Sequence, residues 1–176
     1  MEEKRKWVWI PVVFVFVVII GVICWWWCFR PLTTALVVRH AERAAVGADP
    51  PLSADGQARA ETLVHVARDA GVVAVYATEW LRTQQTVQPL ADHLGLPVTM
   101  VNALDVEDLG DQVLADHAGE VVVIAGHSNT VPDIVEEFGA DPIPAIAESE
   151  YDNLYVVTDY RFNRAKVLHL NYGEPD

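Results

Sequence analysis

Short apolar runs alternate with amphipathic segments along most of the chain. Four of the runs are predicted to be strands: 35–39, 71–78, 97–101 and 120–125. The run at 120–125 is continuous and apolar, as in a strand that is covered on both faces of a sheet. Four other segments have helical periodicity or helix start and stop signals: 57–70, 80–94, 106–117 and 129–138. Two last runs, 153–160 and 164–172, are predicted to be a closing pair of strands. This alternation predicts an α/β fold, a three-layer sandwich with a mostly parallel sheet and helices on both faces.

A different pattern precedes this domain, because the chain carries no charged residue from Trp7 to Phe29. At about 1.5 Å per residue, a helix of that length measures roughly 35 Å and spans a hydrocarbon core of about 30 Å. The sequence therefore predicts an N-terminal tail at 1–6, one transmembrane helix at 7–29 and a domain at 33–172. A cleaved signal peptide is the alternative, but no A-x-A-like cleavage site follows the apolar block.

The residues that flank the apolar segment predict its orientation. Lys4, Arg5 and Lys6 precede it, and the positive-inside rule then keeps the N-terminus cytoplasmic and puts the domain outside. The tryptophans at 25–27 suit the far membrane–water interface, where amphipathic rings prefer to lie. Basic residues early in the domain weaken the charge asymmetry, so the orientation is an expectation that needs a test.

The domain itself is strongly acidic. The chain has 176 residues and a net charge of −13, and residues 31–176 hold 8 basic and 23 acidic residues. This balance disfavours nucleic-acid binding, which requires a basic face. Both cysteines, Cys24 and Cys28, fall in the apolar segment, so the domain folds without disulfides. A lipid anchor on either cysteine is disfavoured by bulky Ile23 and Trp27, which stand where a lipobox needs a small residue.

Two apolar runs are each followed by a histidine. In "TTALVVRHAER" the run leads to Arg39-His40, and in "EVVVIAGHSNT" it leads to Gly126-His127. Ligands of open α/β sheets bind at the carboxyl ends of the strands, so both histidines are expected at one edge. An arginine and two imidazoles there are suited to a phosphoryl group, because guanidinium groups offer bidentate donors to phosphate oxygens.

Four motifs in the same order resemble those of the histidine phosphatase superfamily, also described as phosphoglycerate-mutase-like. "VRHAER" resembles the Arg-His-Gly signature, with Ala41 in place of the glycine, as in an "RHAE" type. "DPPLSADGQARA" resembles the Leu-Ser/Thr-x-x-Gly stretch that opens the next helix. "VYATEWLRTQQTVQPLA" resembles the segment with the second arginine, here Arg82, and "AGHSNT" resembles the second histidine block. The resemblance covers nearly all of 33–172.

The resemblance implies a phosphatase that hydrolyses phosphomonoesters, or protein phosphohistidine, through a phosphohistidine intermediate. His40 would be the nucleophile, neutral on the attacking nitrogen and with its other N–H held by a carbonyl. Arg39, Arg82 and His127 would bind the phosphate and neutralise its oxygens as the phosphoryl group moves. Neither a metal nor another cofactor is implied. Arg43, Ser128 and Asn129 are further candidates for the border of such a site.

The donor of a proton to the leaving group is less clear from the sequence. In many relatives an acidic residue after the third strand serves, and "NALDVEDLGD" offers Asp105, nearest the strand end. The other acidic side chains of this stretch stay open as alternatives: Glu107, Asp108 and Asp111. Part of the superfamily uses an aspartate directly after the second histidine, but Ser128 stands at that position here.

The gaps between the matched motifs are short, so the resemblance lacks the cap insertions that enclose substrates in larger relatives. An open site suits a small-molecule, lipid-linked or protein phosphate, and the sequence does not choose among them. It also does not indicate the oligomeric state.

Three other functions stay open on the residues alone. The chain could be a non-catalytic, membrane-tethered phosphate-binding module with the same site. A serine hydrolase would use Ser128 as nucleophile and His169 as base, but Thr130 replaces the second glycine of a nucleophile elbow. A metal site on His40 and His127 would lack any close ligand spacing.

Overall fold

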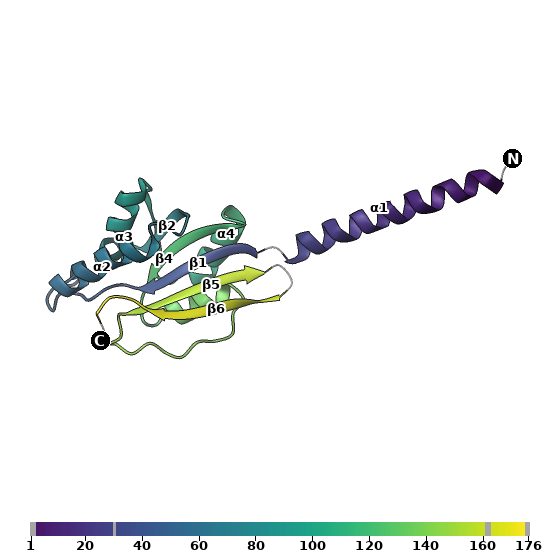
Figure 1. Ribbon diagram of the computed structural model, residues 1–176. Helices are drawn as coiled ribbons and strands as arrows, with labels where there is room; N and C mark the ends of the chain where they lie inside the picture. Colours follow the sequence, from purple (N-terminus) through teal and green to yellow (C-terminus); the bar gives the residue numbers. More distant parts are fainter. Residues whose placement is uncertain (1–2, 30, 161–162, 175–176) are drawn as a thin grey trace.

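The computed structural model describes residues 3–29, 31–160 and 163–174, with side chains described for 12–26, 33–160 and 164–174. Among these residues one six-stranded sheet has the order β3-β2-β4-β1-β5-β6 (Figure 1). Four strands run parallel: β1 (Pro31–Arg39), β2 (Val72–Thr78), β3 (Val98–Val101) and β4 (Glu120–Gly126). The closing pair, β5 (Asn153–Tyr160) and β6 (Asn163–Asn171), is antiparallel. The predicted α/β class is confirmed, and the sheet is mixed.

Helices cover both faces of the sheet. On one face lie α2 (Ala54–Ala67) and α3 (Leu81–Leu94), and on the other lie α4 (Val106–Asp116) and α5 (Val131–Glu137). The side chains of β1 alternate between the two cores, as period-2 geometry requires. Leu36 and Val38 pack with the α2–α3 layer, whereas Ala35 and Val37 pack with the α4–α5 layer. The continuous apolar character of β1 and β4 thus arises because both faces of these strands are buried.

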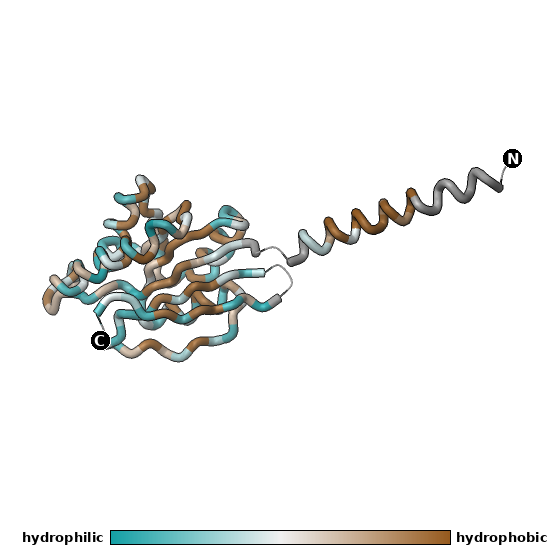
Figure 2. Tube along the Cα trace, viewed as in Figure 1, coloured by the Kyte–Doolittle hydropathy of each residue, from teal (hydrophilic) through white to brown (hydrophobic). Residues whose placement is uncertain are grey.

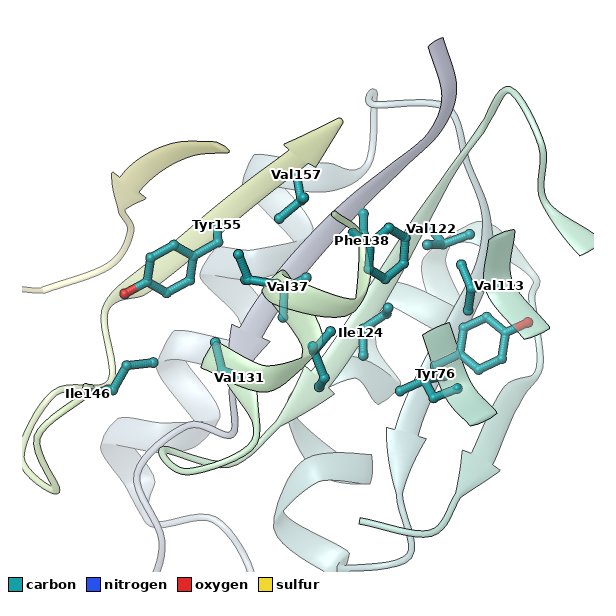
Figure 3. Close-up of a cluster of buried hydrophobic side chains, with 14 residues drawn as sticks. Val37, Tyr76, Val113, Val122, Ile124, Val131, Phe138, Ile146, Tyr155 and Val157 are labelled. Atoms are coloured by element: carbon teal, nitrogen blue, oxygen red, sulfur yellow. The ribbon is translucent and has the colours of Figure 1, made fainter. Parts of the chain in front are cut away.

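The core under α4 and α5 is the more aromatic of the two. Phe138, at the end of α5, is buried against the sheet, with Tyr76 and Tyr155 toward opposite sides of the cluster (Figure 3). Each fully buried side chain of this size contributes about 1.5–3 kcal/mol of hydrophobic stabilisation. This packing fixes the strands whose ends form the site described below.

Three helices lie within two residues of their predicted bounds, whereas α2 lies three residues earlier than predicted at both ends. Helix α2 begins at Ala54, three residues before the prediction, because the Ser53 side chain caps it by accepting a hydrogen bond from the Gly56 N–H at 3.1 Å. The segment between α5 and β5 has no regular structure over most of its length and runs back along the sheet (Figure 1).

A long helix, α1 (Glu3–Phe29), precedes β1 and extends away from the domain (Figure 1). Its described side chains at 12–26 are exposed and largely apolar (Figure 2). Within the described residues, no helix meets the length and apolarity required to cross a membrane. The ends of the predicted transmembrane segment, 7–11 and 27–29, lie outside the residues whose side chains are described, as does the whole of the predicted tail, 1–6.

Candidate active site

The carboxyl ends of β1, β2 and β4 meet at one edge of the sheet. Arg39 lies in register with Gly126, and the His40 N–H donates to the Gly126 carbonyl at 2.9 Å. Thr78 ends β2, beside β4. The side chains that follow these strands therefore converge, and the rings of His40 and His127 lie 5.3 Å apart between centroids. This is the edge at which open α/β sheets bind ligands.

Gly126 lies in the closely packed turn that places His127. A Cβ at this position would lie 3.0 Å from the Thr130 hydroxyl oxygen and 3.1 Å from the Ile134 methyl carbon. The same Thr130 hydroxyl accepts the backbone N–H of His127 at 3.0 Å. A side chain at residue 126 would therefore disturb both the start of α5 and the position of His127.

The loop after His40 is held by Glu42, the acidic residue of the "RHAE" sequence. Its backbone carbonyl accepts the Ser53 N–H at 2.8 Å, and a Cβ on Gly56 would lie 2.1 Å from that carbonyl oxygen. Its carboxylate accepts from the buried Arg59 at 2.6 to 3.1 Å. Arg59 also donates to the carbonyl of Tyr172 at 2.8 Å. Glu42 thus joins the loop to α2 and to the C-terminal end of the described chain.

A pocket of about 440 Å³ lies at this edge, and three arginines, Arg39, Arg43 and Arg82, give it positive charge within an acidic chain. The lining comes from the ends of β1, β2 and β4, the loops after β1, β3, β4 and α5, and the first turn of α3: Arg39, His40, Arg43, Gly47, Ala48, Pro50, Trp80, Arg82, Ala103, Leu104, His127, Ser128, Asn129, Thr130 and Glu148.

His40 is neutral and fixed in one tautomer. Its Nδ1 lies 2.8 Å from the Ala41 carbonyl, which can only accept, so Nδ1 carries the proton and Nε2 carries the lone pair. Burial, together with the positive charges of Arg39 and Arg82, lowers the pKa of His40 to about 3 against the opposing effect of the hydrogen bond to Ala41. A carbonyl therefore holds the imidazole as a nucleophile requires.

His127 is held in the opposite tautomer. Arg82 Nη2, which can only donate, lies 3.4 Å from Nδ1, so the proton is on Nε2 and is donated to the Thr78 hydroxyl at 3.0 Å. The Thr78 hydroxyl in turn lies 2.7 Å from that of Thr83, which lies 2.7 Å from the Trp80 carbonyl. Burial, followed by the charge of Arg82, lowers the pKa of His127 to about 4. A phosphate dianion nearby would favour the charged imidazolium and give the pocket another donor.

Arg82 is positioned by the first turn of α3. Asp49 accepts the Leu81 N–H at 3.1 Å and lies 3.7 Å from Arg82 Nη1. The guanidinium lies over the Trp80 ring, 4.7 Å from its centroid. Burial lowers the pKa of Arg82, although the residue stays charged at any working pH. Its buried Nε has no hydrogen-bond partner among the described residues.

Arg39 is almost completely buried, with 1% of its side chain exposed, and is held by the segment before β5. Nη1 donates to the carbonyls of Ala147 and Glu150, each at 2.8 Å. Nη2 donates to the Glu148 carboxylate at 3.2 Å, and the guanidinium lies 4.2 Å from the centroid of the Tyr151 ring. The irregular segment 147–151 is thus part of the site.

The structure brings together the four residues predicted from strand ends and motifs: Arg39, His40, Arg82 and His127. It also places Arg43, Ser128 and Asn129 at the pocket. Asp105 is exposed at the start of α4 and is not among the lining residues, although its neighbours Ala103 and Leu104 are. The other acidic candidates of that stretch do not line the pocket either: Glu107, Asp108 and Asp111. The catalytic roles of all these residues stay predictions.

The serine-hydrolase arrangement is not assembled. Ser128 donates to Glu148 at 2.6 Å, whereas His169 is bonded to Asn153 at 2.6 Å, stacks on Tyr155 and borders a different pocket. Within the described part of the chain, no group of three or more His, Cys, Asp or Glu side chains is arranged to hold a metal ion.

Sequence reasoning missed Glu148, Tyr151 and Thr78. The first two lie in a segment without periodicity or a matched motif, so nothing in the sequence located them at the site. Thr78 had a usable signal, because it directly ends a predicted strand at the same sheet edge as Arg39.

Comparisons with known proteins agree with this geometry. A model of the histidine phosphatase superfamily (branch 1) matches residues 35–112. No curated protein matches the chain significantly by sequence.

Solved structures match over most of the chain. The protein histidine phosphatase SixA, solved with tungstate, has a TM-score of 0.65 at 17% identity, covering 78% of this chain and 96% of its own. Mycobacterial glucosyl-3-phosphoglycerate phosphatase has a TM-score of 0.65 at 13% identity, with coverage of 82% and 100%. A proposed phosphohistidine phosphatase SixA from Nakamurella multipartitia has a TM-score of 0.60 at 21% identity, with coverage of 81% and 96%. The chain therefore has the fold of these phosphatases, and its match to the superfamily model covers Arg39, His40 and Arg82.

Proposed function

We propose that the chain is a histidine phosphatase, which hydrolyses phosphomonoesters or protein phosphohistidine through a phosphohistidine formed on His40. One observation carries the proposal: a neutral His40, with Nδ1 held by the Ala41 carbonyl, borders the same pocket as Arg39, Arg82 and His127. A lone pair on Nε2 beside two guanidinium groups is what attack on a phosphate requires, because the nucleophile must approach an anion.

In the first step, His40 Nε2 forms a bond to phosphorus as the bond between phosphorus and the leaving oxygen breaks. The two arginines neutralise the equatorial oxygens, and His127 adds a donor once the phosphate has raised its pKa. In the second step, water forms a bond to phosphorus, the bond to Nε2 breaks, and phosphate leaves. The Ala41 carbonyl stabilises the imidazole while it carries the phosphoryl group.

The similarity to phosphatase structures supports this proposal, and SixA was solved with tungstate, a tetrahedral oxyanion like phosphate. The pocket has charge and volume for a phosphate group and part of the attached alcohol. A small-molecule, a lipid-linked or a protein phosphate is compatible with it.

We further propose that the reaction needs no metal or other cofactor, because arginines and imidazoles supply the charge that a metal supplies elsewhere. Activity is then expected to survive EDTA and to be inhibited by vanadate. Loss of activity in EDTA with recovery on added zinc would favour a metal-dependent reaction.

We also propose that α1 anchors the domain to a membrane, with the N-terminus cytoplasmic and the domain outside. The exposed apolar side chains at 12–26 and the basic residues Lys4, Arg5 and Lys6 support this placement. The full chain is expected to resist carbonate extraction, and protease added to spheroplasts is expected to digest the domain. Digestion only after lysis would reverse the orientation and favour a cytoplasmic substrate.

The central test uses the full chain in detergent with a panel of phosphomonoesters and a phosphohistidine-containing protein. Wild type is expected to turn over at least one substrate and to form an acid-labile, base-stable phosphoenzyme. His40→Ala should abolish both, whereas His65→Ala, which changes an exposed histidine of α2, should change neither. Phosphate binding without turnover in wild type would favour the non-catalytic binding module.

A further inference from the structure

The segment 147–151 reaches the pocket from a connection far away in the sequence. Four of its five residues contact Arg39: two through backbone carbonyls, Tyr151 through its ring and Glu148 through its carboxylate. The carbonyls occupy Nη1, so they orient the guanidinium and leave Nη2 toward the pocket. Glu148 is the member of this segment that lines the pocket with His40.

The Glu148 carboxylate lies on donors that a phosphoryl group would also use. Oε2 accepts from Arg39 Nη2 at 3.2 Å, and Oε1 accepts from the Ser128 hydroxyl at 2.6 Å. Its side chain is 79% exposed, so these two contacts hold it without enclosing it. A bound phosphate that takes Nη2 would displace the carboxylate by a small rotation and leave it beside the phosphate.

We propose that Glu148 is the catalytic acid and base of this site, a role that rests on the proposed phosphatase function. It would protonate the leaving oxygen in the first step and accept a proton from the attacking water in the second. Asp105, the candidate from the sequence, does not line the pocket, whereas Glu148 does.

The protonation of Glu148 follows from what surrounds it before and after substrate binds. In the free site, the Ser128 hydrogen bond and the charge of Arg39 lower the pKa of Glu148, so the carboxylate is ionised. A phosphate dianion that replaces it on Arg39 removes an attractive charge and adds a repulsive one. Both changes favour the protonated carboxyl group, which is the form that can donate.

The two steps balance with this residue as the carrier of one proton. In the first, the bond from Nε2 to phosphorus forms, the phosphorus–oxygen ester bond breaks, and the Glu148 proton goes to the leaving oxygen, which departs as the alcohol. In the second, water oxygen bonds to phosphorus, the bond to Nε2 breaks, and the water proton returns to Glu148. The products are the alcohol and phosphate, with both side chains restored.

A leaving-group series tests the proposal in the full chain, with phenyl, 4-nitrophenyl and 2,4-dinitrophenyl phosphate as substrates. A poor leaving group needs a proton and a good one does not. Glu148→Gln is therefore expected to lower kcat/KM for phenyl phosphate about 10²- to 10³-fold, the range of general acid catalysis. With 2,4-dinitrophenyl phosphate the loss is expected to be several-fold at most. Glu148→Asp should recover part of the phenyl phosphate activity.

Two variants and one profile complete the experiment. Glu136→Gln changes an exposed carboxylate of α5 and should match wild type with every substrate. With phenyl phosphate, the kcat of wild type should fall as the pH is raised, and this fall should be absent in Glu148→Gln. An equal loss for all leaving groups would overturn the proposal and leave Glu148 as a support for Arg39. If kcat/KM falls more for poor leaving groups than for good ones in Asp105→Asn, and does not fall in Glu148→Gln, the proposal is overturned in favour of Asp105.

The failure of this inference differs from the failure of the proposed function. If wild type and His40→Ala have equal activity with 2,4-dinitrophenyl phosphate, the phosphatase itself is wrong and Glu148 has no such role. If His40→Ala is inactive but Glu148→Gln matches wild type with phenyl phosphate, only the role of Glu148 is wrong.

Discussion

Strand β4 has a histidine beyond each of its ends, and the two histidines have opposite surroundings. His117 precedes the strand, where the Glu120 carboxylate accepts its Nδ1–H at 3.0 Å and the Tyr76 hydroxyl donates to Nε2 at 2.9 Å. His127 follows the strand, where Nδ1 accepts from Arg82 and Nε2–H is donated to Thr78. Both imidazoles are thus held by hydroxyl groups of β2, but in opposite tautomers.

The contrast shows that the partner, rather than the residue type, decides what a histidine does. A carboxylate and a phenol satisfy His117 completely, so it joins β2 to the loop before β4. The partner of His127 Nδ1 is the cation Arg82, so the positive charge at this end of the strand has no counter-charge on His127 and attracts an anion. The two ends of one strand therefore differ in chemistry because Arg39, Arg43 and Arg82 gather at the carboxyl edge, whereas a carboxylate and a phenol surround His117.

Removal of the cation that distinguishes the two ends is expected to have the largest effect. Arg82→Ala should lower kcat/KM about 10³-fold, since one charge-assisted donor to a developing oxyanion contributes on the order of 10²–10³ in rate. Arg68→Ala, at the exposed end of α2, is the matched control and should leave the rate unchanged. A loss below tenfold in Arg82→Ala would mean that Arg82 does not bind the phosphoryl group.

Exchange of each histidine compares the two ends directly. His127→Asn should lower kcat about 10²-fold, because the pocket loses an imidazole that becomes a charged hydrogen-bond donor when phosphate is bound. His117→Asn should keep its kcat and lower the Tm, because it loses contacts to Tyr76 and Glu120. Steady-state kinetics and thermal unfolding of both variants measure this. Equal kinetic effects would remove the distinction between the two ends.

The hydroxyl groups of β2 offer a finer comparison. Thr78→Val removes the hydroxyl group that accepts His127 Nε2–H and orients the ring, and it should lower kcat about tenfold, as a misplaced catalytic group does. Tyr76→Phe removes the equivalent group of His117 and should cost about 1 kcal/mol of stability without a change in kcat. If Thr78→Val lowers kcat even when His127 is already Asn, the hydroxyl acts in some other way.

The last comparison concerns the pH dependence of stability. The pKa of His127 falls from its ordinary 6.5 to about 4 in the folded protein, so the unfolded chain binds more protons between those values. The free energy of unfolding should therefore fall as the pH falls from 6.5 to 4, by up to about 1.4 kcal/mol per pH unit from this residue. Urea unfolding at several pH values should show that the free energy of unfolding changes less with pH in His127→Asn than in His117→Asn. An equal dependence on pH in the two variants would contradict the lowered pKa of His127.

The sequence predicted the residues at strand ends and missed those that arrive by irregular chain. Arg39, His40 and His127 each lie at the end of an apolar run. Because the carboxyl ends of parallel strands meet at one edge of the sheet, the pattern of apolar runs was enough to predict that these residues lie close together. Glu148 lies 109 residues from Arg39 in a segment without periodicity, and its contact depends on the path of an irregular loop.

The role of Glu42 could not be predicted either. Its partner, Arg59, lies in a helix whose pattern indicated only a buried face, and the pair forms because Gly56 lets α2 approach the Glu42 carbonyl closely. Close approach of two backbones leaves no periodic signal in a sequence. The glycine itself, however, stood in a matched motif.

The position of β1 between β4 and β5 has a consequence for the order in which the chain is made. β1 is the first strand to be synthesised, yet Arg39 and the start of β4 at Glu120 are roughly 80 residues apart, and β5 comes later still. At about 5–20 residues per second, the ribosome needs roughly 4 to 16 s to supply the first partner of β1. Through that interval a largely apolar strand has both edges unpaired, a state prone to aggregation. The strand that carries Arg39 at its end therefore depends on protection from aggregation until β4 has been made.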